Sequence, residues 1–237
     1  MSLRICILET DHIRPELVER YQGYGRMFEQ LFERQPVPAS FEIFNVVEGH
    51  YPPAGERYDA YLVTGSKADS FGSDPWIAPL KAFLLARYNE GAKLLGVCFG
   101  HQLLALLLGG KAERAHQGWG VGTHQYSVGA KASWMAPAAD GLTLLISHQD
   151  QVTALPEGAT VVASSAFCPF AAFQLNDQVL CFQGHPEFVH DYSRALLELR
   201  QMNLGEQVYK AAVDSLVHDH DGATVAEWMM RFVAQGK

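Results

Sequence analysis

The chain has 237 residues, of which 48% are hydrophobic, and a formal net charge of -8 at pH 7. This length and apolar content suffice for a large core without a disulfide framework, and the acidic balance argues against a nucleic-acid-binding surface. No apolar run approaches the roughly 18–20 residues that a membrane span needs, and the short N-terminal one is followed at once by Glu9 and Asp11. With four cysteines at no metal-finger spacing, the sequence predicts a soluble, reduced, cytoplasmic protein.

In the first half of the chain, predicted strands alternate with predicted helices. The helical spacing lies over residues 15–35 and 73–91, and a third helix follows residue 98. The β-rich runs before and between these helices are 3–9, 41–47, 58–65 and 93–98. Strands that alternate with helices indicate βαβ units, so we expect an α/β protein with a largely parallel central sheet.

The second half has a different pattern. Between about residues 111 and 185, short strands follow one another with turns between them, which predicts a small antiparallel portion joined to the α/β core. Two or three helices end the chain, including 191–201 and 224–235. No internal repeat, low-complexity tract or obvious linker interrupts the sequence, so we expect one domain over residues 1–237, with the C-terminal helices at about 190–237.

The sequence GVCFG, from Gly96 to Gly100, lies where a predicted strand meets a predicted helix. A sharp strand-to-helix turn can hold a nucleophile, and it needs flanking glycines because side chains there would collide with the strand and helix beside it. Cys98 would then lie at a helix N-terminus, which favours a thiolate, and the Phe99 N–H would point toward an oxyanion. The alternative is a buried cysteine in a tight turn with no catalytic role.

A second segment, GHPE, supplies the groups that a cysteine nucleophile needs. His185 ends a predicted strand and Glu187 lies two positions on, so both side chains share one face of an extended segment, helped by Pro186. A carboxylate beside an imidazole fixes its tautomer and stabilises its charged form. A capped histidine at a strand end is the structural alternative. A zinc deaminase would need a P-C-x-x-C segment further on, and no cysteine follows residue 187.

GVCFGHQ followed by GHPE resembles the class I glutamine amidotransferase (triad glutaminase) family, including stand-alone members similar to the glutaminase part of GMP synthase. The segments SHQDQV and YDAYLVTGS match this family too, and together the matches cover about residues 40–190. The resemblance implies a three-layer, flavodoxin-like α/β fold with a nucleophile elbow. It also implies a nucleophile, a base and an orienting acid, which are Cys98, His185 and Glu187 in that order.

The resemblance implies substrate-binding positions as well. The oxyanion would be held by the backbone N–H groups of Gly65 and Phe99, and the glutamine by Gln102. The α-amino and α-carboxylate ends of the substrate would meet Ser147, Gln149 and Asp150. This chain departs from the family in the turn TGSKADS after Gly65, which is more polar than usual. We expect little to hold that turn in place.

The implied activity is hydrolysis of the side-chain amide of glutamine through a cysteine thioester, giving glutamate and ammonia, with no metal or organic cofactor. The chain has no phosphate-binding loop, so an ammonia-accepting synthetase would be another chain. That partner would dock near the turn after Gly65 and restore a misplaced oxyanion donor, so the isolated protein would hydrolyse glutamine slowly. The alternatives are a γ-glutamyl peptide hydrolase with the same triad, and a non-catalytic regulatory or partner-binding module.

Three further features have simpler interpretations. His218 and His220, in the run 217–222, are expected in a solvated loop rather than in a metal site. The Gly-, His- and Trp-rich segment 116–124 is expected to border the substrate pocket, as in the family, and the alternative is an ordinary turn before a strand. The apolar cluster at 228–232 has helical spacing and is expected in the core.

Overall fold

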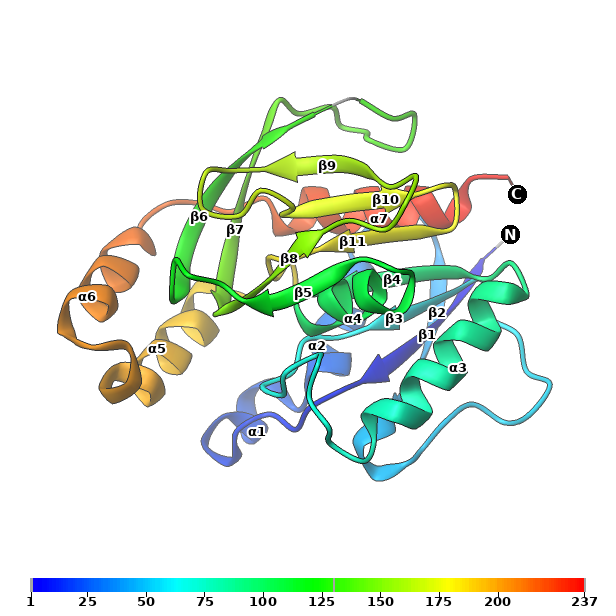
Figure 1. The fold of residues 1–237 in the computed structure, drawn as a ribbon, viewed down its shortest axis with the longest axis horizontal. Coiled ribbons are helices and arrows are strands. Elements are labelled where there is room, and N and C mark those ends of the chain that lie inside the picture. Colours follow the sequence, from blue (N-terminus) through cyan, green and yellow to red (C-terminus); the bar gives the residue numbers. More distant parts are fainter. Residues whose placement is uncertain (1, 130, 237) are drawn as a thin grey trace.

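The computed structural model describes residues 2–129 and 131–236. Its largest element is a nine-stranded sheet with the strand order β2-β1-β3-β4-β11-β10-β9-β6-β7 (Figure 1). The strands of this sheet are β1 Leu3–Glu9, β2 Ala39–Asn45, β3 Ala60–Val63, β4 Lys93–Val97, β6 Gly120–Val128, β7 Gly141–His148, β9 Thr160–Ser164, β10 Ala172–Leu175 and β11 Val179–Phe182. A separate two-stranded sheet pairs β5 Lys111–Arg114 with β8 Asp150–Ala154.

The direction of the strands changes within the large sheet. The five strands from β2 to β11 are parallel to their neighbours, and β10, β9, β6 and β7 continue the sheet in antiparallel pairs. The predicted parallel core with an antiparallel portion is therefore confirmed. The antiparallel strands β10, β9, β6 and β7 extend the same sheet, because β10 pairs with the edge of β11 that does not face β4.

Helices cover both faces of the parallel part, which gives the predicted three layers (Figure 1). Side chains alternate across β1: Ile5 and Ile7 pack with α2 and α7, and Cys6 and Leu8 pack with α3 and α4. The helices of these two outer layers are α2 Tyr24–Phe32, α7 Gly222–Ala234, α3 Ile77–Asn89 and α4 Phe99–Leu107. Strands buried on both faces explain the nearly continuous apolar runs in this half of the sequence.

The predicted helical segment 15–35 is two helices, α1 Pro15–Tyr21 and α2 Tyr24–Phe32. Gln22 has a φ of 63°, in the left-handed region that ends a right-handed helix. A Glu9 carboxylate oxygen accepts a hydrogen bond from the Gly25 N–H at 2.9 Å and so binds the first turn of α2. The break leaves the apolar spacing nearly unchanged, which is why the pattern alone does not reveal it.

Helices α5 His190–Leu204 and α6 Glu206–Ser215 project beyond the end of the sheet formed by β6 and β7 (Figure 1). Both contact β6, and α5 also contacts β7. Their apolar side chains pack with Ile13 and Leu17 from the N-terminal segment and with Phe188. None of the helices in the described part of the chain is long and apolar enough to cross a membrane.

Candidate functional site

Three adjacent parallel strands of the sheet lead into the residues of the candidate site. Strands β3, β4 and β11 lie side by side, and each points its carboxyl end to the same edge of the sheet. Gly65, Cys98 and His185 follow these three strands within one to three residues. In open α/β sheets, ligands bind outside the carboxyl ends of the strands, so the topology brings these residues to one place.

Cys98 lies in a sharp turn between β4 and α4, with φ 52° and ψ -100°. A Cβ on Gly96 would lie 2.6 Å from the Gly100 carbonyl oxygen. A Cβ on Gly100 would lie 2.3 Å from the carbonyl oxygen of Val63. The two glycines are thus required by close approach of backbone atoms, and Cys98 takes a conformation that a non-glycine residue rarely adopts.

His185 is held from several sides. Its backbone N–H donates to the Leu145 carbonyl at 2.9 Å, and its Nδ1 lies 2.7 Å from the Glu187 Oε1. The Phe188 ring stacks on the imidazole, with ring centroids 3.9 Å apart. Both His185 and Glu187 are buried, and His185 and Cys98 both lie against Gly65 and border one small cavity. The three residues of the predicted triad are therefore brought together.

The pKa values of two histidines of the site are shifted in opposite directions. Burial lowers the pKa of His185, but the charges of Glu187 and Cys98 and the hydrogen bonds to both raise it, to about 10. The pKa of His148 is lowered to about 3, by burial and then by the charge of His185. At neutral pH His185 is therefore charged and His148 is neutral. A charged imidazole beside a cysteine and a carboxylate is an arrangement suited to nucleophilic acyl transfer.

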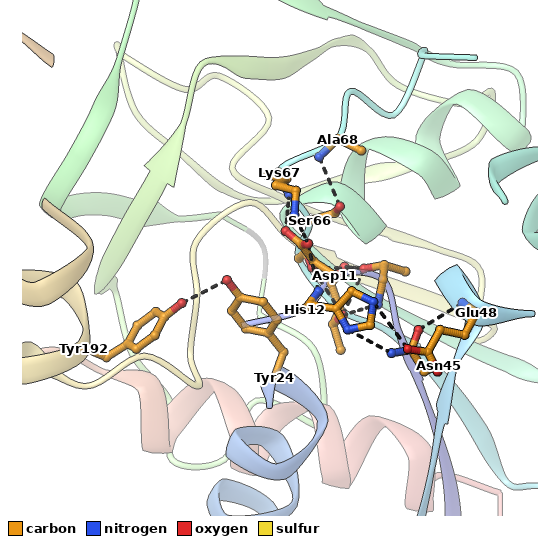
Figure 2. Close-up of polar contacts among 12 residues, drawn as sticks. Asp11, His12, Tyr24, Asn45, Glu48, Ser66, Lys67, Ala68 and Tyr192 are labelled. Atoms are coloured by element: carbon orange, nitrogen blue, oxygen red, sulfur yellow. Dashed lines mark hydrogen bonds and ion pairs between the residues drawn. The ribbon is translucent and has the colours of Figure 1, made fainter. Parts of the chain in front are cut away.

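The turn after Gly65 is held firmly, and the expectation that little fixes it is wrong. The Asp11 carboxylate accepts hydrogen bonds from the backbone N–H and the ammonium of Lys67, at 2.9 and 2.8 Å (Figure 2). Ser66 Oγ accepts from the Ala68 N–H at 3.1 Å (Figure 2). The polar side chains that distinguish this turn are therefore what fixes it, together with a carboxylate from a segment 56 residues earlier.

The two residues predicted to donate to the oxyanion, Gly65 and Phe99, both adjoin Cys98. Phe99 is the first residue of α4, directly after the cysteine. The carbonyl of Thr64, on the same peptide as the Gly65 N–H, accepts from the Gly100 N–H at 3.2 Å and the Thr10 hydroxyl at 3.1 Å. Because a trans peptide is planar, these bonds also fix the direction of the Gly65 N–H. A Cβ on Gly65 would lie 2.7 Å from the His185 ring, so this position is in close contact with the imidazole.

The remaining predicted residues line a cavity of about 180 Å³ that opens beside Cys98, named here the acyl cavity. Gln102, Ser147, Gln149 and Asp150 all border it. The Gln102 side-chain amide donates to the backbone carbonyl of Asp150 at 2.8 Å, which ties α4 to β8. Trp119, from the Gly-, His- and Trp-rich segment 116–124, also borders this cavity.

Two arginines that sequence patterns did not single out bind these predicted residues. Arg114 contacts the Asp150 carboxylate and donates to Gln149 Oε1 at 2.8 Å. Arg200 donates to Ser147 Oγ at 2.5 Å and lies over the Trp119 ring. Neither arginine belongs to a local motif. Arg114 lies in a short strand, and Arg200 is a half-buried residue on the same face of α5 as Leu196 and Leu197. Phe188 was also missed, although it directly follows Glu187.

No group of three or more His, Cys, Asp or Glu side chains in residues 2–129 and 131–236 could hold a metal ion. His218 is exposed in the loop between α6 and α7, and His220 is half-buried there. The predicted core residues of the 228–232 cluster are buried in α7.

Comparisons with known proteins give consistent matches. The family model described as glutamine amidotransferase class-I matches residues 71–201. Gamma-glutamyl peptidase 3 of Arabidopsis thaliana is 33% identical over 178 residues, which cover 71% of this chain and 70% of that protein. GMP synthase (glutamine-hydrolyzing) of Streptococcus equi is 31% identical over 182 residues, which cover 70% of this chain and 32% of that protein.

Solved structures match nearly the whole chain. A glutamine amidotransferase from Thermotoga maritima superposes with a TM-score of 0.79 over 98% of this chain and 99% of its own, at 18% identity. At that identity the match concerns the fold alone.

Proposed function

The chain belongs to the class-I glutamine amidotransferase family, and from this premise we propose that it hydrolyses γ-glutamyl amide bonds through a thioester on Cys98. The observation that carries the proposal is the contact of the buried His185–Glu187 pair with a cysteine held at the elbow. A nucleophile, a base and a group that orients the base are the minimum set for this chemistry. The first committed step is attack of the Cys98 sulfur on the δ-carbonyl carbon.

In the acylation step, the charge that develops on the carbonyl oxygen is stabilised by the N–H groups of Gly65 and Phe99. His185 gives its proton to the leaving nitrogen, the C–N bond breaks, and a γ-glutamyl thioester remains. Glu187 keeps the imidazole in the orientation and tautomer that this transfer needs. The 2.7 Å contact between Glu187 and His185 supports that role.

In the deacylation step, neutral His185 takes a proton from water while the water oxygen attacks the thioester carbonyl. The C–S bond breaks, the thiolate is restored beside charged His185, and glutamate leaves. The γ-glutamyl portion is held in the acyl cavity by Gln102, Ser147, Gln149 and Asp150. The two charged groups next to each other there, Arg114 and Asp150, complement the α-carboxylate and the α-ammonium of that portion.

The leaving group distinguishes two candidate substrates. Glutamine releases ammonia, which a synthetase on another chain could consume, and the similarity to GMP synthase (glutamine-hydrolyzing) favours this candidate. A γ-glutamyl peptide releases an amino acid or peptide, and the similarity to gamma-glutamyl peptidase 3 favours it. A fixed turn after Gly65 means that the oxyanion donor needs no partner to orient it, which favours a hydrolase that acts alone.

The chain is proposed to act as one domain over residues 1–237. Support comes from the sheet, in which β11 of the second half lies against β4 of the first. The cysteine and the histidine of the proposed triad follow these two strands, so neither half would form the site without the other.

Steady-state kinetics on the purified chain tests the proposal. Glutamine and γ-glutamyl dipeptides are compared as substrates, with glutamate as the common product, and Cys98→Ala as the inactive control. A wild-type kcat of about 10 s⁻¹ on a dipeptide without any added protein, the median for enzymes, would favour the peptide hydrolase. Glutamate release that persists in Cys98→Ala, or is absent from the wild type with both substrates, would reject the thioester mechanism.

A further inference from the structure

Two further cavities adjoin the acyl cavity. The smaller one, of about 20 Å³, is bordered by Gly65, Cys98 and His185 and is named here the throat. The larger one, of about 310 Å³, is named here the outer cavity. Lys67 and Arg200 border all three, so the three cavities adjoin one another around these two side chains. The outer cavity also shares Tyr24 and Leu196 with the throat.

The proposed mechanism indicates which part of the substrate lies in each cavity. His185 must donate its proton to the leaving nitrogen, so the leaving group lies on the His185 side of Cys98. His185 borders the throat, whereas the acyl cavity is bordered by Cys98 without His185. The γ-glutamyl portion therefore occupies the acyl cavity, the amide nitrogen occupies the throat, and anything attached to that nitrogen extends into the outer cavity.

The outer cavity is much larger than glutamine requires. A molecule the size of water needs only about 10–15 Å³ of such volume, and ammonia is no larger. Besides its polar groups, the outer cavity is bordered by apolar side chains of Ile13, Pro15 and Leu196. Its size and its apolar wall suit an amino acid or a short peptide as the leaving group.

The charges around the outer cavity are unbalanced. Of its three cations, Lys67 is paired with Asp11 at 2.8 Å, and Asp11 is the one carboxylate that borders the cavity. Arg14 and Arg200, which both border the acyl cavity as well as the outer cavity, form no ion pair with a carboxylate within residues 2–129 and 131–236. Burial lowers the pKa of Arg200, Tyr24 and Tyr192 raise it, the nearby charge of Arg14 lowers it further, and the charge of Cys98 raises it.

The other polar groups near these arginines do not neutralise them. The Tyr24 and Tyr192 hydroxyls are hydrogen-bonded to each other at 2.9 Å (Figure 2). His12 borders the cavity and is exposed. Two guanidinium groups that repel each other next to a cavity favour an anionic ligand, and carboxylates bind guanidinium with matching geometry.

We infer that the outer cavity binds the leaving portion of γ-glutamyl peptides, and that Arg14 and Arg200 pair with a carboxylate on that portion. This inference rests on the proposed function and specifies its substrate class. The preferred substrate has three parts: a γ-glutamyl group, an apolar or small residue, and a free carboxylate. Glutamine fills only the acyl cavity and the throat.

The test uses matched substrates that differ by one charge, γ-glutamyl-alanyl-glycine and its C-terminal amide, with glutamine as the substrate that has no leaving portion. The wild type should prefer the acid over the amide in kcat/KM by about tenfold to a hundredfold, as expected for a charge-assisted hydrogen bond. Arg14→Gln and Arg200→Gln should each reduce this ratio, and the double variant should bring it close to one. Arg194→Gln removes an exposed arginine from the same helix as Arg200 and should leave the ratio unchanged.

Different results would overturn different claims. Equal kcat/KM for the acid and the amide in the wild type would overturn the inference and leave the proposed hydrolysis intact. Equal losses for glutamine and both peptides in Arg200→Gln would assign Arg200 to the γ-glutamyl portion, which also overturns it. If no substrate is cleaved, the proposed function fails. Calorimetric titration of Cys98→Ala then tests binding separately: tighter binding of the acid than of the amide supports the cavity assignment, and equal binding rejects it.

Discussion

Replacing Gly65 by alanine tests how closely the proposed base is confined. The new Cβ would lie 2.7 Å from Cε1 of His185 and 3.6 Å from Cβ of Cys98. The imidazole would have to move by about 0.7 Å, the difference between 2.7 Å and the 3.4 Å at which ordinary contact begins. It has little freedom to do so, because Glu187 binds its Nδ1, Phe188 stacks on its face, and its backbone N–H binds Leu145.

We expect two effects from this substitution. Overpacking beside a fixed ring costs about 1–3 kcal/mol of unfolding free energy, which for a chain of this size lowers Tm by roughly 2–12 °C. Displacement of a catalytic group by most of an ångström should lower kcat/KM on γ-glutamyl substrates by roughly tenfold to a hundredfold. Steady-state kinetics at a temperature well below Tm separates the two effects.

Gly141→Ala is the matched control. Gly141 begins β7 at an exposed position outside the three cavities, and its built Cβ comes no closer than 3.3 Å to another atom. This variant should keep wild-type kcat/KM and nearly wild-type stability. Wild-type kinetics in Gly65→Ala, with an unchanged pH profile, would refute the argument that contact with Gly65 positions the base.

Three further predictions concern the same site. Cys98→Ala should abolish hydrolysis with little change in Tm. Cys98→Gly should be more stable than Cys98→Ala by about 1 kcal/mol, because glycine relieves the backbone strain at φ 52°. Equal thermal denaturation midpoints for the two variants would contradict this. Glu187→Gln should slow turnover and move the alkaline limb of the pH–rate profile to lower pH, because the charge of this carboxylate is the largest of the effects that raise the pKa of His185 to about 10. An unmoved limb would count against this assignment. His148, whose pKa burial lowers to about 3, stabilises the fold above pH 6.5 and loses this contribution as the pH falls toward 3. In urea titrations His148→Gln should therefore lose less stability than the wild type over that range, and parallel losses would contradict the assignment.

The fold and the proposed triad could be predicted from local sequence patterns. The order of strands and helices predicted the parallel core, since alternating elements can bury their apolar faces in few other ways. Gly96 and Gly100 marked the elbow because two backbone segments must approach within the space of a side chain. His185 and Glu187 are two positions apart, so their contact is local and readable from sequence. The structure places Glu187 in a turn after β11, not on the extended segment that the sequence predicted.

Contacts between distant segments were not readable in this way. The turn after Gly65 looked free because its anchor, Asp11, lies 56 residues before Lys67 and in no motif with it. The break between α1 and α2 was not predicted, because the apolar spacing continues across it. The start of α2 is bound by Glu9 of β1, which lies outside the helical segment.

The sequence by itself determined the layered α/β fold, the elbow at Cys98 and the pairing of His185 with Glu187, because each depends on backbone geometry or on residues a few positions apart. Only the tertiary structure decided what surrounds them. Arg14 and Arg200 are 186 positions apart, yet both border the acyl cavity and the outer cavity, because α5 packs against the N-terminal segment at the end of the sheet. The charge of a cavity depends on which unpaired side chains the fold brings to it, and no spacing along the chain records that.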